Sequence, residues 1–133
     1  MPITVLTELA KQIIDDANFA TLATLNADGS PQASIMWIAR DGNDLLMSTC
    51  EGRLKLKNMR RDPRISMTVF DKDQPYAQIE VRGSVEIISE GGQELIDKMA
   101  RKYLGTDFEW DKPGAVRVVL RLKPQTIVGS ASI

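Results

Sequence analysis

Closely spaced turn signals are the feature that most restricts the fold of this sequence. Asn26-Ala-Asp-Gly-Ser30 and Asp41-Gly42-Asn43 both place a glycine where a tight turn needs a positive φ. The stretches between such turns are short, apolar and often rich in Thr, Val or Ile, as in strands. The pattern predicts antiparallel strands over residues 19–25, 32–39, 44–49, 64–70, 76–88, 115–122 and 126–128.

Helical spacing of apolar residues is confined to a few short segments. It predicts amphipathic helices over residues 4–16 and 93–104, the second ending at Gly105. A basic helix follows the third strand and stops at Pro63, because the residue before a proline is disfavoured in the α region. Gly83 lies inside the longest strand and suggests a bulge or a bend there. Many strands with a few helices indicate a mainly β fold, an antiparallel barrel or sandwich.

Composition limits the kinds of function. The 133 residues fit one domain over 1–133, and a net charge of −1 argues against nucleic acid as a partner. The single cysteine, Cys50, excludes an internal disulfide, and the lack of histidine excludes His-based triads and His-ligated metals. We expect no metal site. No stretch is apolar enough to span a membrane and no signal peptide is recognised, so we expect a cytoplasmic protein without a membrane partner.

The segment from Met47 to Pro63 is the strongest candidate for a binding site. Two hydroxyl residues, Ser48 and Thr49, end a strand, Gly52 breaks it, and a cationic helix begins. Free N–H groups at a helix start favour an anion, and hydroxyl and guanidinium groups donate to phosphate oxygens. The segment therefore predicts a phosphate site. The alternative is a solvated basic helix that merely joins two strands.

The distribution of charge along this helix favours the site. At about 100° per residue, Arg53, Lys57, Arg60 and Arg61 fall on one face, away from Leu56 and Met59. Like charges on one face repel one another. A bound anion would relieve that repulsion.

Several motifs, taken in order, resemble one family. They are Phe19-Ala-Thr-Leu-Ala-Thr-Leu25, Asp28-Gly-Ser-Pro-Gln32, Leu46-Met-Ser-Thr49, Gly52-Arg-Leu-Lys-Leu-Lys-Asn-Met-Arg-Arg-Asp-Pro63, Ile79-Glu-Val-Arg-Gly83 and Leu122-Lys-Pro-Gln-Thr-Ile-Val-Gly129. Together they resemble the pyridoxamine-phosphate-oxidase-like, FMN-binding split β-barrel family, and most closely its branch that uses the deazaflavin coenzyme F-420. The resemblance implies a mainly β, Greek-key-like split β-barrel of six or more antiparallel strands with short decorating helices.

The resemblance also implies a homodimer with two cofactor sites at the subunit interface. Phosphate or ribityl contacts would come from Ser48, Thr49, Arg53, Lys55 and Asn58, with Lys57 as a weaker candidate. Residues along the cofactor ring would be Gln32, Ser34, Ile35, Met36 and Trp37, with Met47 beside them. Tyr76 and Gln78 would approach from the neighbouring subunit. No catalytic side chain can be assigned, as expected where a cofactor performs the chemistry.

The function implied is an oxidoreductase that passes a hydride from reduced F-420 to a small conjugated acceptor. The chain is shorter than pyridoxamine phosphate oxidases and lacks their C-terminal Arg/His substrate residues, which argues against that reaction. An FMN-dependent oxidoreductase and a non-catalytic cofactor-binding protein remain alternatives. Lys57, Arg60 and Arg61 exceed what one phosphate needs and favour F-420, whose tail is anionic.

Some of these residues have a purely structural alternative. Trp37 is either a ring-stacking residue or part of the barrel wall or dimer interface. Met36 and Met47 are also typical of adaptable core packing. Tyr76 could contact either a ligand or a second subunit.

Overall fold

A computed structural model describes residues 2–132 as a curled antiparallel sheet with three α-helices. The strands are β1 (Ala20–Leu25), β2 (Pro31–Met36), β3 (Ala39–Asp41), β4 (Asp44–Cys50), β5 (Arg64–Asp71), β6 (Gln74–Ile88), β7 (Arg117–Leu122) and β8 (Thr126–Val128). The helices are α1 (Glu8–Asp15), α2 (Leu54–Arg61) and α3 (Gly92–Leu104), followed by a 3-10 turn, η1 (Ser130–Ser132). The predicted mainly β, split-barrel fold is confirmed.

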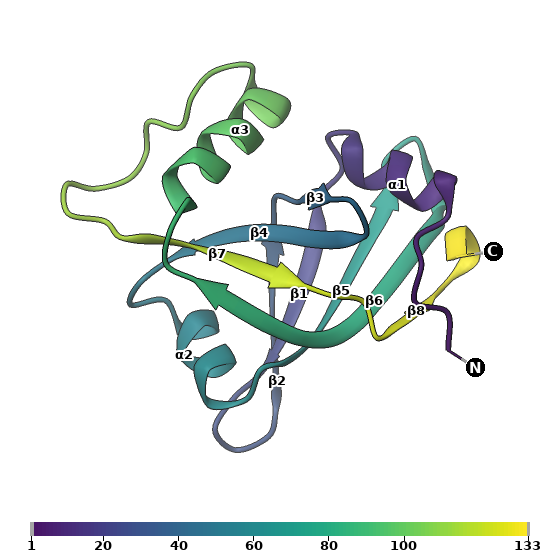
Figure 1. Ribbon diagram of the computed structural model, residues 1–133, viewed down its shortest axis with the longest axis horizontal. Helices are drawn as coiled ribbons and strands as arrows, with labels where there is room; N and C mark the ends of the chain where they lie inside the picture. Colours follow the sequence, from purple (N-terminus) through teal and green to yellow (C-terminus); the bar gives the residue numbers. More distant parts are fainter. Residues whose placement is uncertain (1, 133) are drawn as a thin grey trace.

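The sheet order is β2-β1-β5-β6-β7-β4-β3, with β8 added beside β6. Figure 1 shows β6 as one long curved strand that joins the two halves of the sheet. Residues 74–84 of β6 pair with β5, and residues 85–88 pair with β7. This exchange of partners bends the sheet around one apolar core, whose members include Leu22, Met47 and Val81.

The helices cover the sheet in different ways (Figure 1). Helix α1 contributes Ile13 and Ile14 to the barrel core, and α2 contributes Leu56 and Met59. Helix α3 instead packs outside the barrel, on β4 and β7, around a second apolar cluster. No described helix is long and apolar enough to cross a membrane.

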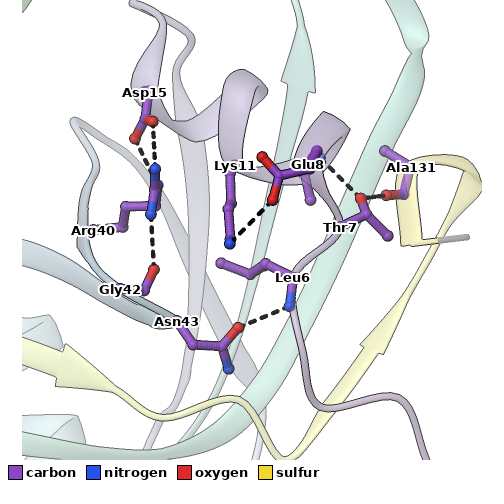
Figure 2. A network of polar contacts seen from close by, with 10 residues as sticks. Leu6, Thr7, Glu8, Lys11, Asp15, Arg40, Gly42, Asn43 and Ala131 are labelled. Carbon is purple, nitrogen blue, oxygen red and sulfur yellow. Dashed lines mark hydrogen bonds and ion pairs between the residues drawn. The ribbon is translucent and has the colours of Figure 1, made fainter.

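Polar contacts fasten the N-terminal helix to the barrel (Figure 2). The guanidinium group of Arg40 donates to both carboxylate oxygens of Asp15, at 2.8 and 2.7 Å. The Leu6 N–H donates to Asn43 Oδ1 at 2.8 Å, in the hairpin between β3 and β4. The Thr7 hydroxyl donates to Ala131 O at 2.6 Å, which joins α1 to the C-terminal turn.

The predicted elements are found, with corrections to several of their bounds, such as β6, which begins at Gln74 rather than at residue 76. The first helix begins at Glu8 rather than residue 4, because Thr7 caps it by accepting from Ala10 N at 3.0 Å. The predicted strand over residues 32–39 is two strands, because the chain leaves β2 at Trp37 and starts β3 at Ala39. The last long strand begins at Arg117 rather than at residue 115.

The sequence predicted a bulge or a bend at Gly83, and the bulge is wrong. Pairing between β5 and β6 runs through Gly83 in register, and the irregularity lies at Phe70/Asp71. A Cβ atom on Gly83 would lie 2.8 Å from Lys123 O and 2.9 Å from Leu122 Cδ1. Gly83 is therefore needed for a close approach of the chain as β6 curves from β8 to β7.

Candidate functional site

A cleft of about 250 Å³ opens where β2, β4, the start of α2, the start of β7 and α3 meet. Its lining divides by chemistry into an apolar part and a polar part. The apolar part consists of Phe19, Ile35, Met36, Trp37, Ile96, Met99 and Phe108. The polar part consists of Ser48, Thr49, Cys50, Arg53, Lys55 and Arg117. Such a lining suits a ligand with a conjugated ring and an anionic group.

Lys55 is the most unusual residue of the polar part. It lies in the first turn of α2 and is 7% exposed. Among the described residues, its Nζ has one hydrogen-bond partner, the thioether of Met36, at 3.3 Å. Burial, and secondly the charge of Arg53, lower the pKa of Lys55. A buried ammonium is costly unless an anion or strong acceptor compensates it, so Lys55 marks a place for an anion.

The start of α2 adds free donors at the same place. Gly52 has φ 93° and lets the chain turn from β4 into the helix. The N-cap residue, Arg53, makes no capping hydrogen bond with its side chain. Within the described chain, the N–H groups of Leu54 and Lys55 have no backbone or side-chain acceptor. These orphan donors and the helix dipole both favour an anion.

The floor of this polar part comes from β4. Ser48 and Thr49 are 7% and 5% exposed, and both line the cleft. Cys50 lies beside them, and desolvation by burial raises the pKa of its thiol. Ser48 and Thr49 therefore contribute hydroxyl groups to the lining of the cleft, and Cys50 contributes a thiol whose pKa is raised.

Aromatic side chains form one wall of the apolar part. The rings of Trp37 and Tyr103 stack at 5.2 Å with an interplanar angle of 6°. Phe108 meets Trp37 edge to face at 5.8 Å. Trp37 therefore packs in the second apolar cluster, outside the barrel core, and also lines the cleft; its stacking on a cofactor ring stays a prediction.

Seven of the residues predicted for the site line this cleft together. They are Ile35, Met36, Trp37, Ser48, Thr49, Arg53 and Lys55. Three elements of the chain bring them together: β2 and the residue after it supply the ring side, β4 the hydroxyl groups, and α2 with its N-cap the cations. The sequence prediction of the place is therefore consistent with the geometry.

The other predicted residues do not line the cleft of the single chain. Asn58 is buried, and its amide donates to Thr24 Oγ1 at 3.1 Å and Asn26 Oδ1 at 2.9 Å. Gln32 accepts from the same Thr24 hydroxyl at 3.0 Å, so Asn58 and Gln32 belong to one structural network. Met47 is fully buried in the barrel core.

Four more lie elsewhere. Ser34 is half-buried on β2, and its Oγ has no hydrogen-bond partner among the described residues. Lys57 is exposed on α2. Tyr76, 83% exposed, and Gln78 stand on the outside of β6, so their predicted contact from a neighbouring subunit stays a prediction.

The remaining cations of α2 have partners on the surface. Arg60 forms a two-point ion pair with Glu51, with both N–O distances 2.6 Å. Arg61 donates to Leu25 O at 2.6 Å and to Asn58 Oδ1 at 2.7 Å.

Arg117 is the charged cleft residue that the sequence interpretation missed; the lining residues Phe19, Cys50, Ile96, Met99 and Phe108 were not predicted for the site either. It begins β7 beside Cys50, and Asp111 holds it through two hydrogen bonds. The hydrogen bonds from Arg117 keep the pKa of the Asp111 carboxyl below its ordinary value. No local pattern identifies Arg117, because its position depends on strand pairing between distant segments.

Comparison with known proteins identifies relatives along nearly the whole chain. A family model described as pyridoxamine 5'-phosphate oxidase matches residues 6–130. An F-420 reductase of known structure is 32% identical, with a TM-score of 0.80, over 89% of this chain and 94% of its own. A conserved hypothetical protein of Mycobacterium tuberculosis is 26% identical, with a TM-score of 0.72, over 94% of this chain and 84% of its own.

A more distant structure has the same fold. A putative pyridoxamine 5'-phosphate oxidase of Listeria innocua is 20% identical, with a TM-score of 0.68, over 91% of this chain and 94% of its own. The family match and the resemblance found in the sequence motifs agree. The chain belongs to the pyridoxamine 5'-phosphate oxidase family.

Proposed function

We propose that this chain is an oxidoreductase whose cleft binds coenzyme F-420 and positions it against a small conjugated hydride acceptor. Membership of the family supports a flavin or deazaflavin oxidoreductase. The similarity to an F-420 reductase supports the deazaflavin. The observation that carries the proposal is Lys55, a buried ammonium that lines the cleft without an anionic partner among the described residues.

The residues present fit a phosphorylated cofactor. Lys55, Arg53 and the N–H groups at the start of α2 would hold its phosphate, together with the hydroxyl groups of Ser48 and Thr49. Each is a donor or a cation, which phosphate oxygens require. Ile35, Met36 and Trp37 would lie along the ring and exclude water from it.

When bound, the cofactor would supply the hydride chemistry. The chain would contribute binding and orientation. No carboxylate or imidazole is among the described residues that line the cleft, so none of them is assigned to move a proton.

We also propose that the chain forms a homodimer that completes the site. Large apolar side chains stay exposed near or beyond the cleft, among them Ile35 at 65%, Leu54 at 54% and Tyr76 at 83%. A second copy of the chain would cover such surface. Light scattering at micromolar concentration should give the mass of a dimer, and a stable monomer would contradict this part of the proposal.

FMN is the second candidate, because it also carries a phosphate on a ribityl chain. The ion pair between Arg60 and Glu51 compensates one of the charges that the sequence alone left for an F-420 tail, and Arg61 already donates to two neutral oxygens. The preference for F-420 therefore rests on the similar reductase rather than on these arginines.

The test is to reduce F-420 and FMN separately and follow their oxidation by quinone and enone acceptors with the purified protein. Faster oxidation of reduced F-420 than of reduced FMN supports the proposal. Turnover with FMN alone would favour the second candidate. Tight binding without turnover by any acceptor would favour a non-catalytic cofactor-binding protein.

A further inference from the structure

Arg117 holds an open set of donors toward the polar part of the cleft. Its Nε and Nη2 atoms donate to Asp111, at 2.6 Å to Oδ2 and 2.9 Å to Oδ1. This side-on pair leaves the end of the guanidinium, Nη1 and the second N–H of Nη2, outside the ion pair. Among the described residues, the one partner of Nη1 is Ser48 Oγ, at a long 3.4 Å. An arginine offers five donors, so the open end can still take an oxyanion in two-point fashion.

Two neighbours hold that open end in place. The side chain of Arg117 is 12% exposed, and its guanidinium carbon lies 4.7 Å from the centre of the Phe108 ring. Asp111 and Phe108 both belong to the segment between α3 and β7. A guanidinium fixed on two sides loses little freedom when it binds an anion, which is what a receptor needs.

The charges of the cleft leave room for this role. Its described lining contains three cations, Arg53, Lys55 and Arg117, and no carboxylate. Asp111 compensates one of these charges from behind Arg117. Two positive charges therefore remain for a ligand. Ser48, a proposed phosphate donor, lies next to the open end of Arg117.

We propose that Arg117 is a further binding residue for the cofactor phosphate, acting from β7 against Arg53 and Lys55 on α2, and that Asp111 is its positioning residue. The inference rests on the proposed function, since it concerns the same cleft. It makes the site a three-cation receptor built by segments that lie far apart in sequence.

The test uses two pairs of ligands in which one member lacks the phosphate. FMN and riboflavin differ by the phosphate alone and are the decisive pair. The second pair is F-420 and its deazaflavin chromophore, which lacks both the phosphate and the anionic tail attached through it. Dissociation constants are measured for the wild type and for Arg117→Gln, Arg117→Lys and Asp111→Asn. Arg121→Gln is the matched control, because Arg121 lies on the same strand but pairs with Asp41 and Asp44, away from the cleft.

Arg117→Gln should weaken the binding of the phosphate-bearing ligand about tenfold or more, as expected for a lost hydrogen bond to a charged group. It should leave the affinity for the phosphate-free ligand nearly unchanged. The affinity of Arg117→Lys should lie between those of the wild type and Arg117→Gln, since lysine keeps the charge but not the planar guanidinium. Asp111→Asn should lose part of the phosphate-dependent affinity. Arg121→Gln should bind like the wild type.

Three results would overturn the inference, and they separate it from the proposed function. If the wild type binds neither pair, both fail. If Arg53→Gln weakens the phosphate-bearing ligand and Arg117→Gln does not, the function stands and the role of Arg117 is wrong. If Arg117→Gln weakens both members of a pair equally, Arg117 shapes the cleft and does not bind phosphate.

Discussion

The Nζ atom of Lys55 lies 3.3 Å from the Sδ atom of Met36, and no carboxylate of the described chain pairs with it. A thioether is a weak acceptor and cannot replace the water that a buried ammonium loses. The position of Lys55 is therefore unfavourable for the single chain on its own. An anionic ligand in the cleft would reverse that cost, which explains why a lysine can be kept there.

Replacing Lys55 should stabilise the free protein. Lys55→Met removes the desolvated charge and keeps an unbranched side chain of similar length, so the free energy of unfolding should rise by about 1 kcal/mol. Urea unfolding without ligand measures it. A loss of stability would show that the buried charge of Lys55 is already compensated in the free protein.

Lys102 should make stability depend on pH in the mildly alkaline range. Its Nζ donates to Ile14 O at 2.7 Å and Ile38 O at 2.6 Å, and burial lowers its pKa to about 8. Between about pH 8 and 10 the unfolded chain then binds the proton that the folded chain has lost, so this residue makes stability rise with pH.

The comparison with Lys102→Met isolates that contribution from other groups. Cys50 acts in the opposite direction, since burial raises its pKa and its contribution falls as pH rises past the ordinary value. The unfolding free energy of the wild type minus that of Lys102→Met should therefore increase from pH 8 to pH 10. A value that stays flat or decreases over this range would contradict the lowered pKa.

Arg60 should matter little for the cofactor. Its guanidinium is held by Glu51 on the surface, with both partners substantially exposed. Arg60→Ala should change the free energy of unfolding little, as for an exposed ion pair, and should leave F-420 affinity unchanged at low salt. A loss of affinity in Arg60→Ala that disappears when the F-420 tail is shortened would instead assign Arg60 to the tail.

Gly83 should not tolerate a side chain. A Cβ atom there would lie 2.8 Å from the Lys123 carbonyl oxygen, a backbone atom that cannot move freely. Gly83→Ala should lower the free energy of unfolding by about 1–3 kcal/mol through overpacking. The adjacent, exposed Ser84→Ala should stay within about 0.5 kcal/mol, and an equal effect of both would refute the close-approach explanation.

Features that depend on adjacent residues could be predicted from the sequence, whereas features that depend on contacts between distant segments could not. Gly29 and Gly42 have the positive φ that their turn sequences predicted, because a turn depends on adjacent residues. The break after Met36 was missed because it depends on Tyr103, whose hydroxyl accepts from Ile38 N at 3.1 Å. That contact joins residues 65 positions apart, so no local pattern contains it.

The candidate site shows the same division. The motif around Ser48 and Lys55 is continuous in sequence, so its place and its donors could be predicted. Periodicity also placed four cations of α2 on one face, away from the apolar residues, but it could not show that Lys55 turns inward while Arg60 meets Glu51. Arg117 could not be predicted, because strand pairing alone brings it beside Cys50.

The most direct test of the account is the affinity of F-420 for Lys55→Met compared with Lys57→Met. The two lysines lie two positions apart on α2, but Lys55 is buried in the cleft and Lys57 is exposed. Titration followed by the absorbance or fluorescence of F-420 should show a loss of about 1.5–3 kcal/mol for Lys55→Met, as for a hydrogen bond to a charged group, and wild-type affinity for Lys57→Met. Undiminished binding by Lys55→Met, or an equal loss in both variants, would contradict the placement of the cofactor phosphate.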